Sequence, residues 1–457
     1  MEANLGGVNL FFLFICFMLF TFLLSKLRTG NFINIITPFM FIWVLMLFFS
    51  HFMAGNLYQV SDKTYNAIYL FVSLVVFWFL MFSKKINSLK NISQIQNYFG
   101  SKKSKVGNRL LIIIQIAVLL ILLLYLIKYN NIKNSISIDQ LRIVRYYVGP
   151  FFSTSFELLF YNYVISTFVE LMGLIAIVKV IMNYEVDIRT ILSLSSLIIF
   201  SLIGLGRFGL FNVIYFVIAT FLFLKISFYK NQLNKKMCKN VIFMLGIIGT
   251  MITLMVLIGS TRQGKQLSNI SDFFLMLSES FYQAIIYFIG PFRSLDYFFH
   301  YSSNYVEGWL YGKAFFSGID EFFSFLFSSI GIHWTSGNSV ISLLTSEPID
   351  IGPKFTFNAF YTAVLNAYLD GGYYGIAILG SLLGVLTSFI WNFHLRKRNF
   401  YSFLLMIYFS LILISTEYRF EFQQFKSYVI VLLLIILSNA NCKIKLENAD
   451  CKIKLDN

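Results

Sequence analysis

One charged residue, Arg207, interrupts the apolar run from residue 191 to 224, within the stretch SLIGLGRFGLFNVI. A charged side chain in hydrocarbon is costly and marks a candidate functional site. A helix of that length would measure about 51 Å, whereas the hydrocarbon core is roughly 30 Å thick. We therefore expect the run to break at Gly204, Gly206 and Gly209, with Arg207 at a turn between two spans. There it either binds an anion with help from helix N-termini or contacts lipid headgroups.

Five further arginines fall in segments that we place on the same, outer side of the membrane. Guanidinium groups bind phosphate in a planar, bidentate geometry and stay charged when partly buried. Together with Arg207 they suggest a phosphate-bearing ligand at the outer leaflet. The alternatives are surface helices, headgroup anchors and local ion pairs. The five are Arg142, Arg145, Arg262, Arg293 and Arg419.

Two of these arginines have acids close by in the sequence. Arg293 precedes Asp296, and Arg419 lies between Glu417 and Glu421. A structural ion pair is therefore the alternative to ligand binding at both positions.

Three residues are candidates for acid–base chemistry. Glu170 lies near the middle of the fifth predicted span, where a carboxylate is either functional or held by a structural hydrogen bond. His300 is either a general base or an ordinary surface histidine, and Asp370 precedes a glycine-rich helix start. Aromatic residues of the same region either stack on sugar rings or form an interfacial belt. They are Trp309, Tyr311, Trp334, Tyr361 and Tyr368.

The composition places all of these residues in a membrane protein. The chain has 457 residues, of which 58% are hydrophobic and 12% charged, and apolar stretches of about 20 residues recur along it. Only helices or closed barrels satisfy the backbone in lipid, so we predict an all-α polytopic integral membrane bundle. Eleven spans are expected, or thirteen if two moderately apolar loop segments also cross. The eleven lie at about 8–26, 32–54, 64–83, 110–128, 156–178, 190–206, 208–228, 240–258, 371–393, 399–416 and 427–440.

Lysine and arginine set the predicted orientation. Three basic connections, at residues 84–109, 230–239 and 396–398, fall on one side with this count of spans. The positive-inside rule makes that side cytoplasmic, with the N-terminus outside and the C-terminus inside. The net charge of +15 is then an orientation signal, and nucleic acid is not an expected partner.

The predicted organisation has four parts. Residues 1–258 form an N-terminal membrane bundle, 259–370 a long outer-face loop with interfacial helices, 371–440 three C-terminal spans and 441–457 a cytoplasmic basic tail. The four cysteines show no metal-binding spacing, so neither a metal nor another cofactor is expected.

A resemblance to a known family rests on three segments. Residues 357–386, FNAFYTAVLNAYLDGGYYGIAILGSLLGVL, lead through Asp370 into a span rich in small residues. Residues 204–213 and 259–265 carry the other matching features. This pattern, with its single long outer loop, resembles the bacterial O-antigen and capsule repeat-unit polymerases of the Wzy type. The chain departs from that pattern at Gly371, where the family has phenylalanine.

The resemblance implies a GT-C-like, metal-independent glycosyltransferase of the bacterial cytoplasmic (inner) membrane. Its substrate would be an oligosaccharide repeat unit on undecaprenyl diphosphate, joined into O-antigen or capsule at the outer face among membrane lipids. A polysaccharide chain-length regulator is the implied protein partner. The six outer arginines would bind the diphosphate, and Glu170, His300 and Asp370 are the catalytic candidates.

Two other functions stay open. An O-antigen ligase would use the same donor with a different acceptor. A flippase or transporter for lipid-linked oligosaccharides would be expected to show internal repeats, and the two halves of the chain show none.

Overall fold

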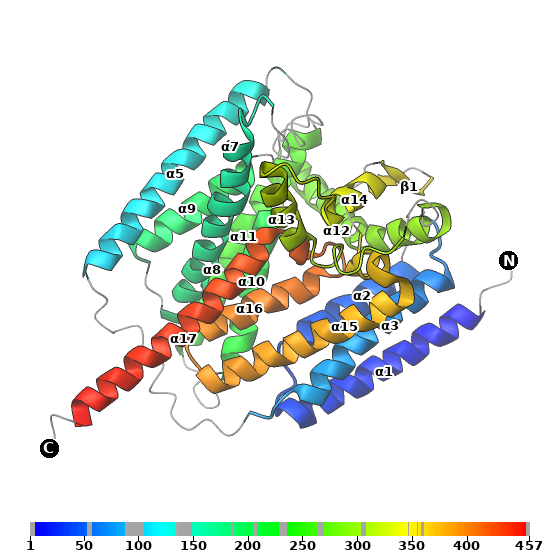
Figure 1. Cartoon of the computed structure of the whole chain (residues 1–457), viewed down its shortest axis with the longest axis horizontal. Helices are drawn as coiled ribbons and strands as arrows, with labels where there is room; N and C mark the ends of the chain where they lie inside the picture. Colours follow the sequence, from blue (N-terminus) through cyan, green and yellow to red (C-terminus); the bar gives the residue numbers. More distant parts are fainter. Residues whose placement is uncertain are drawn as a thin grey trace. The chain divides into compact units, whose positions relative to one another are not determined.

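The computed structural model describes most of the chain (Figure 1). The described residues are 5–52, 57–86, 105–133, 135, 149–183, 186–203, 208–227, 235–263, 269–302, 308–345, 347–353, 355–357 and 361–453. They are almost entirely helical. The exception is one antiparallel pair of short strands, β1 (Ile349–Gly352) and β2 (Phe355–Phe357).

The helices follow one another along the chain with short connections. The first group is α1 (Leu5–Thr29), α2 (Thr37–Phe52), α3 (Asp62–Phe82), α5 (Lys105–Lys133), α7 (Ser155–Leu159), the π-helical turn η2 (Phe160–Ile165), α8 (Ser166–Asn183), α9 (Ile188–Leu202), α10 (Phe208–Ser227) and α11 (Lys235–Gln263). The second group is α12 (Ile270–Tyr297), the π-helical turn η3 (Phe298–Ser302), α13 (Ser317–Ser329), α14 (Gly337–Leu344), α15 (Ala363–Lys397), α16 (Phe400–Ser415), the 3₁₀ turn η5 (Glu421–Gln423) and α17 (Phe425–Ile453).

Each of the eleven predicted spans coincides with helical structure. Six helices are long and apolar enough to cross a membrane, and six shorter ones are apolar as well. The prediction of an all-α membrane protein is confirmed at this level, and the number of crossings stays a prediction. One of the six long helices covers residues 270–301, where we expected an interfacial or re-entrant segment.

The apolar run around Arg207 breaks where its glycines predicted. α9 ends at Leu202 and α10 begins at Phe208, and Arg207 itself lies outside the described residues. A side chain at Gly209 would meet the Ser201 hydroxyl at 2.5 Å, so glycine lets the two helices approach closely.

The chain divides into two compact units. Unit 1 contains residues 1–90 and 283–457, and unit 2 contains residues 91–282. In unit 2, α8 packs against α9 and α10, and α5 packs against α9.

The main contact of unit 1 joins α3 and α15, which run parallel. A Cβ at Gly380 would lie 3.3 Å from the Phe71 side chain, and one at Gly384 would lie 2.5 Å from the Val75 carbonyl oxygen. Small residues of this kind let membrane helices pack closely. The seam therefore fixes α15 against α3 along several turns.

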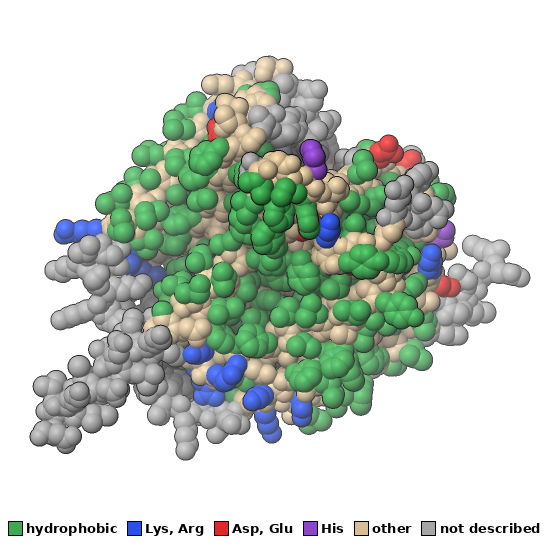
Figure 2. All heavy atoms as spheres, in the orientation of Figure 1, with side chains coloured by type: hydrophobic (Ala, Val, Ile, Leu, Met, Phe, Trp, Pro, Cys, Tyr) green, Lys and Arg blue, Asp and Glu red, His purple; other side chains and the backbone are tan. Residues whose placement is uncertain are grey.

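The carboxyl ends of α1, α3 and α15 meet at one end of unit 1. Trp391 Nε1 donates to the Lys84 carbonyl oxygen at 3.1 Å, and the Ile86 amide donates to the Thr29 carbonyl oxygen at 2.9 Å. We call this the basic end. Figure 2 shows lysine and arginine side chains gathered in the lower part of the view. The basic residues of these helix ends are Lys26, Arg28, Lys84, Lys85, Arg396, Lys397 and Arg398.

The opposite end of unit 1 is where α3 and α15 begin and where α2, α12 and α16 end. The Ala363 amide donates to the Thr416 carbonyl oxygen at 2.8 Å, and Trp43 Nε1 donates to Thr416 Oγ1 at 3.2 Å. We call this the site end, because several predicted site residues lie there.

Candidate functional site at the start of α3 and α15

The predicted site residues fall into three groups. Arg142, Arg145 and Arg207 lie outside the described residues, and for Arg262 the structure describes only the backbone, in α11. Glu170 belongs to unit 2. Unit 1 brings together the others, which are Arg293, His300, Asp370 and Arg419.

Glu170 is buried on α8 and faces α10. Its Oε1 accepts a long hydrogen bond, 3.5 Å, from Asn212 Nδ2. The contact links two helices across the interior of unit 2, which corresponds to the structural role considered for this carboxylate.

Arg293 is buried, with 4% of its surface exposed. Its Nε donates to the Tyr58 carbonyl oxygen at 3.0 Å, and Nη1 donates to Ser50 Oγ and to the Ile289 carbonyl oxygen, each at 3.0 Å. The guanidinium thus ties α12 to the end of α2 and to the segment before α3. Because its donors are directed at the protein itself, Arg293 is better suited to holding the site end together than to gripping a ligand.

Asp296 caps α3 from another helix. Its Oδ1 accepts from the Ser61 amide at 3.1 Å, from Thr64 Oγ1 at 2.7 Å and from the Ser61 hydroxyl. Ser61 occupies the N-cap position of α3 but makes no capping bond of its own. A carboxylate at this place satisfies free amides and complements the helix dipole.

His300 lies one turn beyond Asp296, in the π-helical turn η3. Its Nδ1 is 2.9 Å from the Asp296 carbonyl oxygen and 3.7 Å from Asp296 Oδ1. A carbonyl oxygen can only accept, so Nδ1 carries the proton and the neutral ring keeps its lone pair on Nε2. The side chain is 49% exposed. His300 therefore combines an oriented ring with access to ligand, and π-helical turns are frequent at functional sites.

Asp370 fastens a neighbouring loop to α15. Its Oδ1 accepts from the Ala314 amide at 2.9 Å and its Oδ2 from the Phe315 amide at 2.8 Å. The backbone carbonyl oxygens of Leu369 and Asp370 accept from the Leu310 and Tyr311 amides at 2.9 and 3.3 Å. These bonds hold the segment 308–315, which we call the docked loop. They suit Asp370 to positioning that loop more than to moving a proton.

The helix α15 is broken directly after Asp370. Gly372 adopts a φ of 62° and a ψ of −142°, a conformation that favours glycine. A Cβ at this position would lie 3.0 Å from the Trp309 ring. Gly371, the departure from the family pattern, has a φ of 176°, which other residues also adopt.

Four aromatic side chains connect these parts, and we call them the aromatic cluster: Phe299, Trp309, Tyr368 and Tyr373. Tyr368 packs edge-on against Phe299, Trp309 and Tyr373, with ring centroids 4.7, 6.0 and 6.1 Å apart. Lys63 Nζ lies 5.3 Å from the centre of the Phe299 ring. The cluster thus joins η3, α15, the docked loop and the start of α3.

The five aromatic residues singled out in the sequence have different surroundings. Trp309 is 45% exposed and Tyr311 is 83% exposed. Trp334 Nε1 donates to Asp320 Oδ1 at 2.9 Å, and Lys313 Nζ lies 4.1 Å from the centre of its ring. Tyr361 and Tyr368 are partly buried. The docked loop therefore presents the two most exposed rings of this set.

Arg419 forms the local ion pair considered for it. Its Nε lies 3.1 Å from Glu421 Oε1, and its Nη2 contacts the same oxygen. Burial opposes ionisation of Glu421, but Arg419 and Lys426 outweigh it and lower the pKa of this carboxyl. Arg419 is thus engaged in a buried pair at the site end.

Glu417 is a residue whose surroundings the sequence did not predict. It is fully buried, and among the described residues neither of its oxygens has a hydrogen-bond partner. Burial raises the pKa of Glu417 well above its ordinary value, so the carboxyl is neutral at pH 7. The only signal in the sequence was its position directly after an apolar span.

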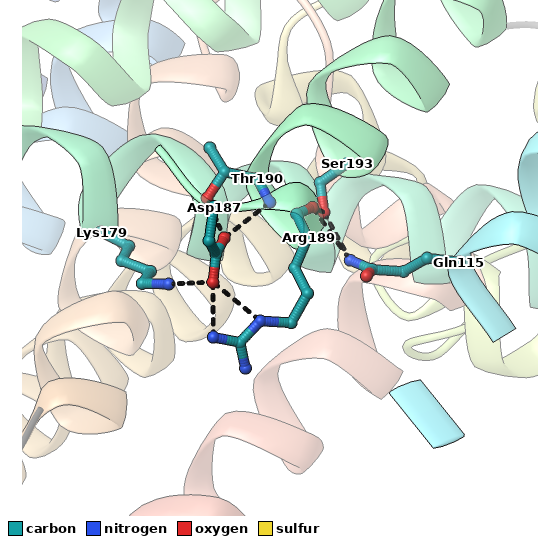
Figure 3. Close-up of polar contacts among 6 residues, drawn as sticks. All are labelled: Gln115, Lys179, Asp187, Arg189, Thr190 and Ser193. Atoms are coloured by element: carbon teal, nitrogen blue, oxygen red, sulfur yellow. Dashed lines mark hydrogen bonds and ion pairs between the residues drawn. The ribbon is translucent and has the colours of Figure 1, made fainter. Parts of the chain in front are cut away.

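A second polar cluster, in unit 2, was also not predicted (Figure 3). Asp187 caps α9 by accepting from the Thr190 amide at 3.0 Å. It also pairs with Lys179 Nζ at 2.6 Å and with the Arg189 guanidinium. Burial opposes ionisation of Asp187, but hydrogen bonds from Lys179, Thr190 and Arg189 outweigh it and lower the pKa of Asp187.

Among the described residues, no group of three or more histidine, cysteine, aspartate or glutamate side chains is arranged to hold a metal ion. No protein-family model, no curated protein and no solved structure matches this chain.

Proposed function

We propose that this protein is a polysaccharide polymerase of the bacterial cytoplasmic membrane. It would join undecaprenyl-diphosphate-linked oligosaccharide repeat units at the outer face, for O-antigen or capsule synthesis. The observation that carries the proposal is the position of His300, whose accessible Nε2 lies beside exposed aromatic rings at the site end of unit 1. The residue pattern shared with the Wzy-type polymerases supports the same reading.

The distribution of charge supports placing this site outside. The basic end of unit 1 holds the carboxyl ends of α1, α3 and α15. The positive-inside rule assigns such an end to the cytoplasm. The site end, at the other ends of α3 and α15, would then face the periplasm or exterior, where lipid-linked repeat units are polymerised.

In the proposed reaction, a hydroxyl oxygen at the non-reducing end of a new lipid-linked unit attacks the anomeric carbon of the growing chain. The bond from that carbon to the diphosphate oxygen breaks, and undecaprenyl diphosphate leaves with the electron pair. His300 Nε2 accepts the hydroxyl proton as general base, and Asp296 positions the ring. Stacking and hydrogen bonds at the site end hold the acceptor in place.

Cations must stabilise the leaving diphosphate. Arg293 and Arg419 bind protein groups, so they would shape the site instead of contacting the diphosphate. Arg142, Arg145, Arg207 and Arg262 stay the proposed diphosphate ligands. Lys63, beside the aromatic cluster, is a further cation at the site end.

The first experiment is deletion of the gene in its own host, followed by gel analysis of the surface polysaccharide. Loss of the long ladder, with single repeat units still exported, is the result expected for a polymerase. Long lipid-linked chains that accumulate without transfer would indicate the ligase. Single units retained at the cytoplasmic face would indicate the flippase, and an unchanged ladder would refute all three readings.

A further inference from the structure

We propose that Trp309 and Tyr311 of the docked loop form a stacking subsite for a sugar ring of the oligosaccharide substrate. The inference rests on the proposed function, because that function supplies the sugar-bearing ligand. It goes further by separating sugar recognition from diphosphate binding and assigning it to two side chains.

The docked loop is held in one conformation. Four backbone amides, those of Leu310, Tyr311, Ala314 and Phe315, donate to the backbone or side chain of Leu369 and Asp370. Asn366 Nδ2 adds a bond of 2.9 Å to the Ala314 carbonyl oxygen. A loop fixed in this way loses little conformational entropy on binding a ligand, which favours affinity.

Tyr311 is strained and exposed at the same time. Its φ is 49°, a left-handed value that is uncommon for a residue other than glycine. Such strain persists where surrounding bonds impose it, and it is concentrated at functional sites. Here it directs a side chain that is 83% exposed, and so it contributes little to packing within the protein.

Trp309 is anchored along one edge. Its six-membered ring lies against Gly372, where a Cβ would come within 3.0 Å, and it packs edge-on to Tyr368 at 6.0 Å. Close to half of the side chain stays exposed. A large aromatic side chain fixed on one side and open on the other offers a surface for stacking.

Polar groups around these rings favour a sugar over a lipid chain. A sugar presents apolar C–H faces together with hydroxyls, so it needs aromatic surface and hydrogen-bonding groups side by side. His300 provides an accessible nitrogen next to Phe299 of the aromatic cluster, and Lys63 lies near the same ring. Lys313 belongs to the docked loop itself.

The test measures sugar binding without the diphosphate. The full chain is reconstituted in nanodiscs, and the probe is the oligosaccharide repeat unit released by mild acid from the lipid-linked pool of the host. Saturation-transfer difference NMR gives the dissociation constant. Trp309→Ala is compared with Trp309→Phe, which keeps an aromatic ring. Tyr311→Ala is compared with Tyr374→Ala, since Tyr374 is 84% exposed and so closely matches Tyr311 in exposure.

We expect Trp309→Ala and Tyr311→Ala each to weaken binding on the order of tenfold, while Trp309→Phe and Tyr374→Ala stay close to the wild type. Equal binding by all four variants would overturn the inference, and so would absence of binding by the wild-type protein. If the two rings anchor the protein to headgroups, the alanine variants change lipid association and leave sugar binding intact, which also overturns it. The deletion experiment tests the polymerase activity separately, so either proposal can fail alone.

Discussion

The polar clusters of the two units differ in what they leave accessible. In unit 2, the carboxylate of Asp187 is shared among Lys179, Arg189 and Thr190, and so its charge is neutralised within the protein. At the site end of unit 1, His300 keeps an accessible nitrogen and the docked loop exposes Trp309 and Tyr311. Charge alone does not identify a functional site. Oriented groups with accessible valences do, and only the second cluster has them.

The largest expected effect is on activity in unit 1. His300→Ala should lower polymer formation on the order of a hundredfold or more, because the acceptor hydroxyl loses its general base. Complementation of the deletion strain, with membrane protein measured by immunoblot, gives the readout. His333→Ala is the matched control, since His333 is an exposed histidine of the same region. Normal ladders from the His300 variant would remove this residue from the reaction.

The next effect is on the seam that supports the site. Gly384→Ala places a Cβ 2.5 Å from the Val75 carbonyl oxygen, and so it should destabilise unit 1 by about 3 kcal/mol. The midpoint of thermal unfolding in detergent measures the loss. Gly249→Ala is the control in unit 2, because a Cβ there meets nothing within 4 Å. Equal midpoints for both variants would contradict the close packing of α3 on α15.

A smaller effect is expected from the neutralised cluster of unit 2. Asp187→Ala should destabilise the protein by about 2 kcal/mol through loss of the cap and ion pairs, without altering polymer made by the folded fraction. Because the folded pKa of Asp187 is lowered, its stabilisation is present above the unfolded value of 3.8 and is lost as pH falls through the folded value. The difference in unfolding midpoint should therefore shrink below pH 4. A polymer defect beyond the loss of protein would show that unit 2 contributes to the reaction through this cluster.

The smallest effect has the opposite sign. Glu417→Gln should raise stability at pH 7.5 by about 1 kcal/mol. Because the folded pKa of Glu417 is raised, the native state loses stability as pH rises above the unfolded value of 4.5, towards the folded value. Glutamine removes this dependence, so the gain should disappear near pH 4. A destabilised variant at pH 7.5 would mean that the carboxyl has an essential partner in the native state.

Local patterns predicted more of this molecule than of its site. The helices followed from apolar runs and their basic ends, and the break before α10 followed from neighbouring glycines. The pair of Arg419 with Glu421 was among the alternatives because the two residues are two positions apart. Such features depend on residues that are close in the chain.

Contacts between distant residues were out of reach of the same reasoning. Asp296 was expected beside Arg293, but its carboxylate caps a helix that begins 234 residues earlier. Asp370 was a candidate base, and its bonds to the docked loop depend on residues more than 50 positions away. A single sequence shows the acceptor and the donors without showing that they meet. The surroundings of Glu417 were hidden for the same reason.

The seam between α3 and α15 also has a consequence for biosynthesis. Phe71 and Gly380, which meet across it, are separated by 309 residues. At about 5–20 residues per second, the ribosome needs roughly 15–60 s to supply the second partner after the first. During that interval α3 is in the membrane with the surface for α15 uncovered, while the whole of unit 2 is being inserted. Assembly of unit 1 must therefore wait for late translation, and a membrane chaperone that shields α3 would raise the yield of folded protein.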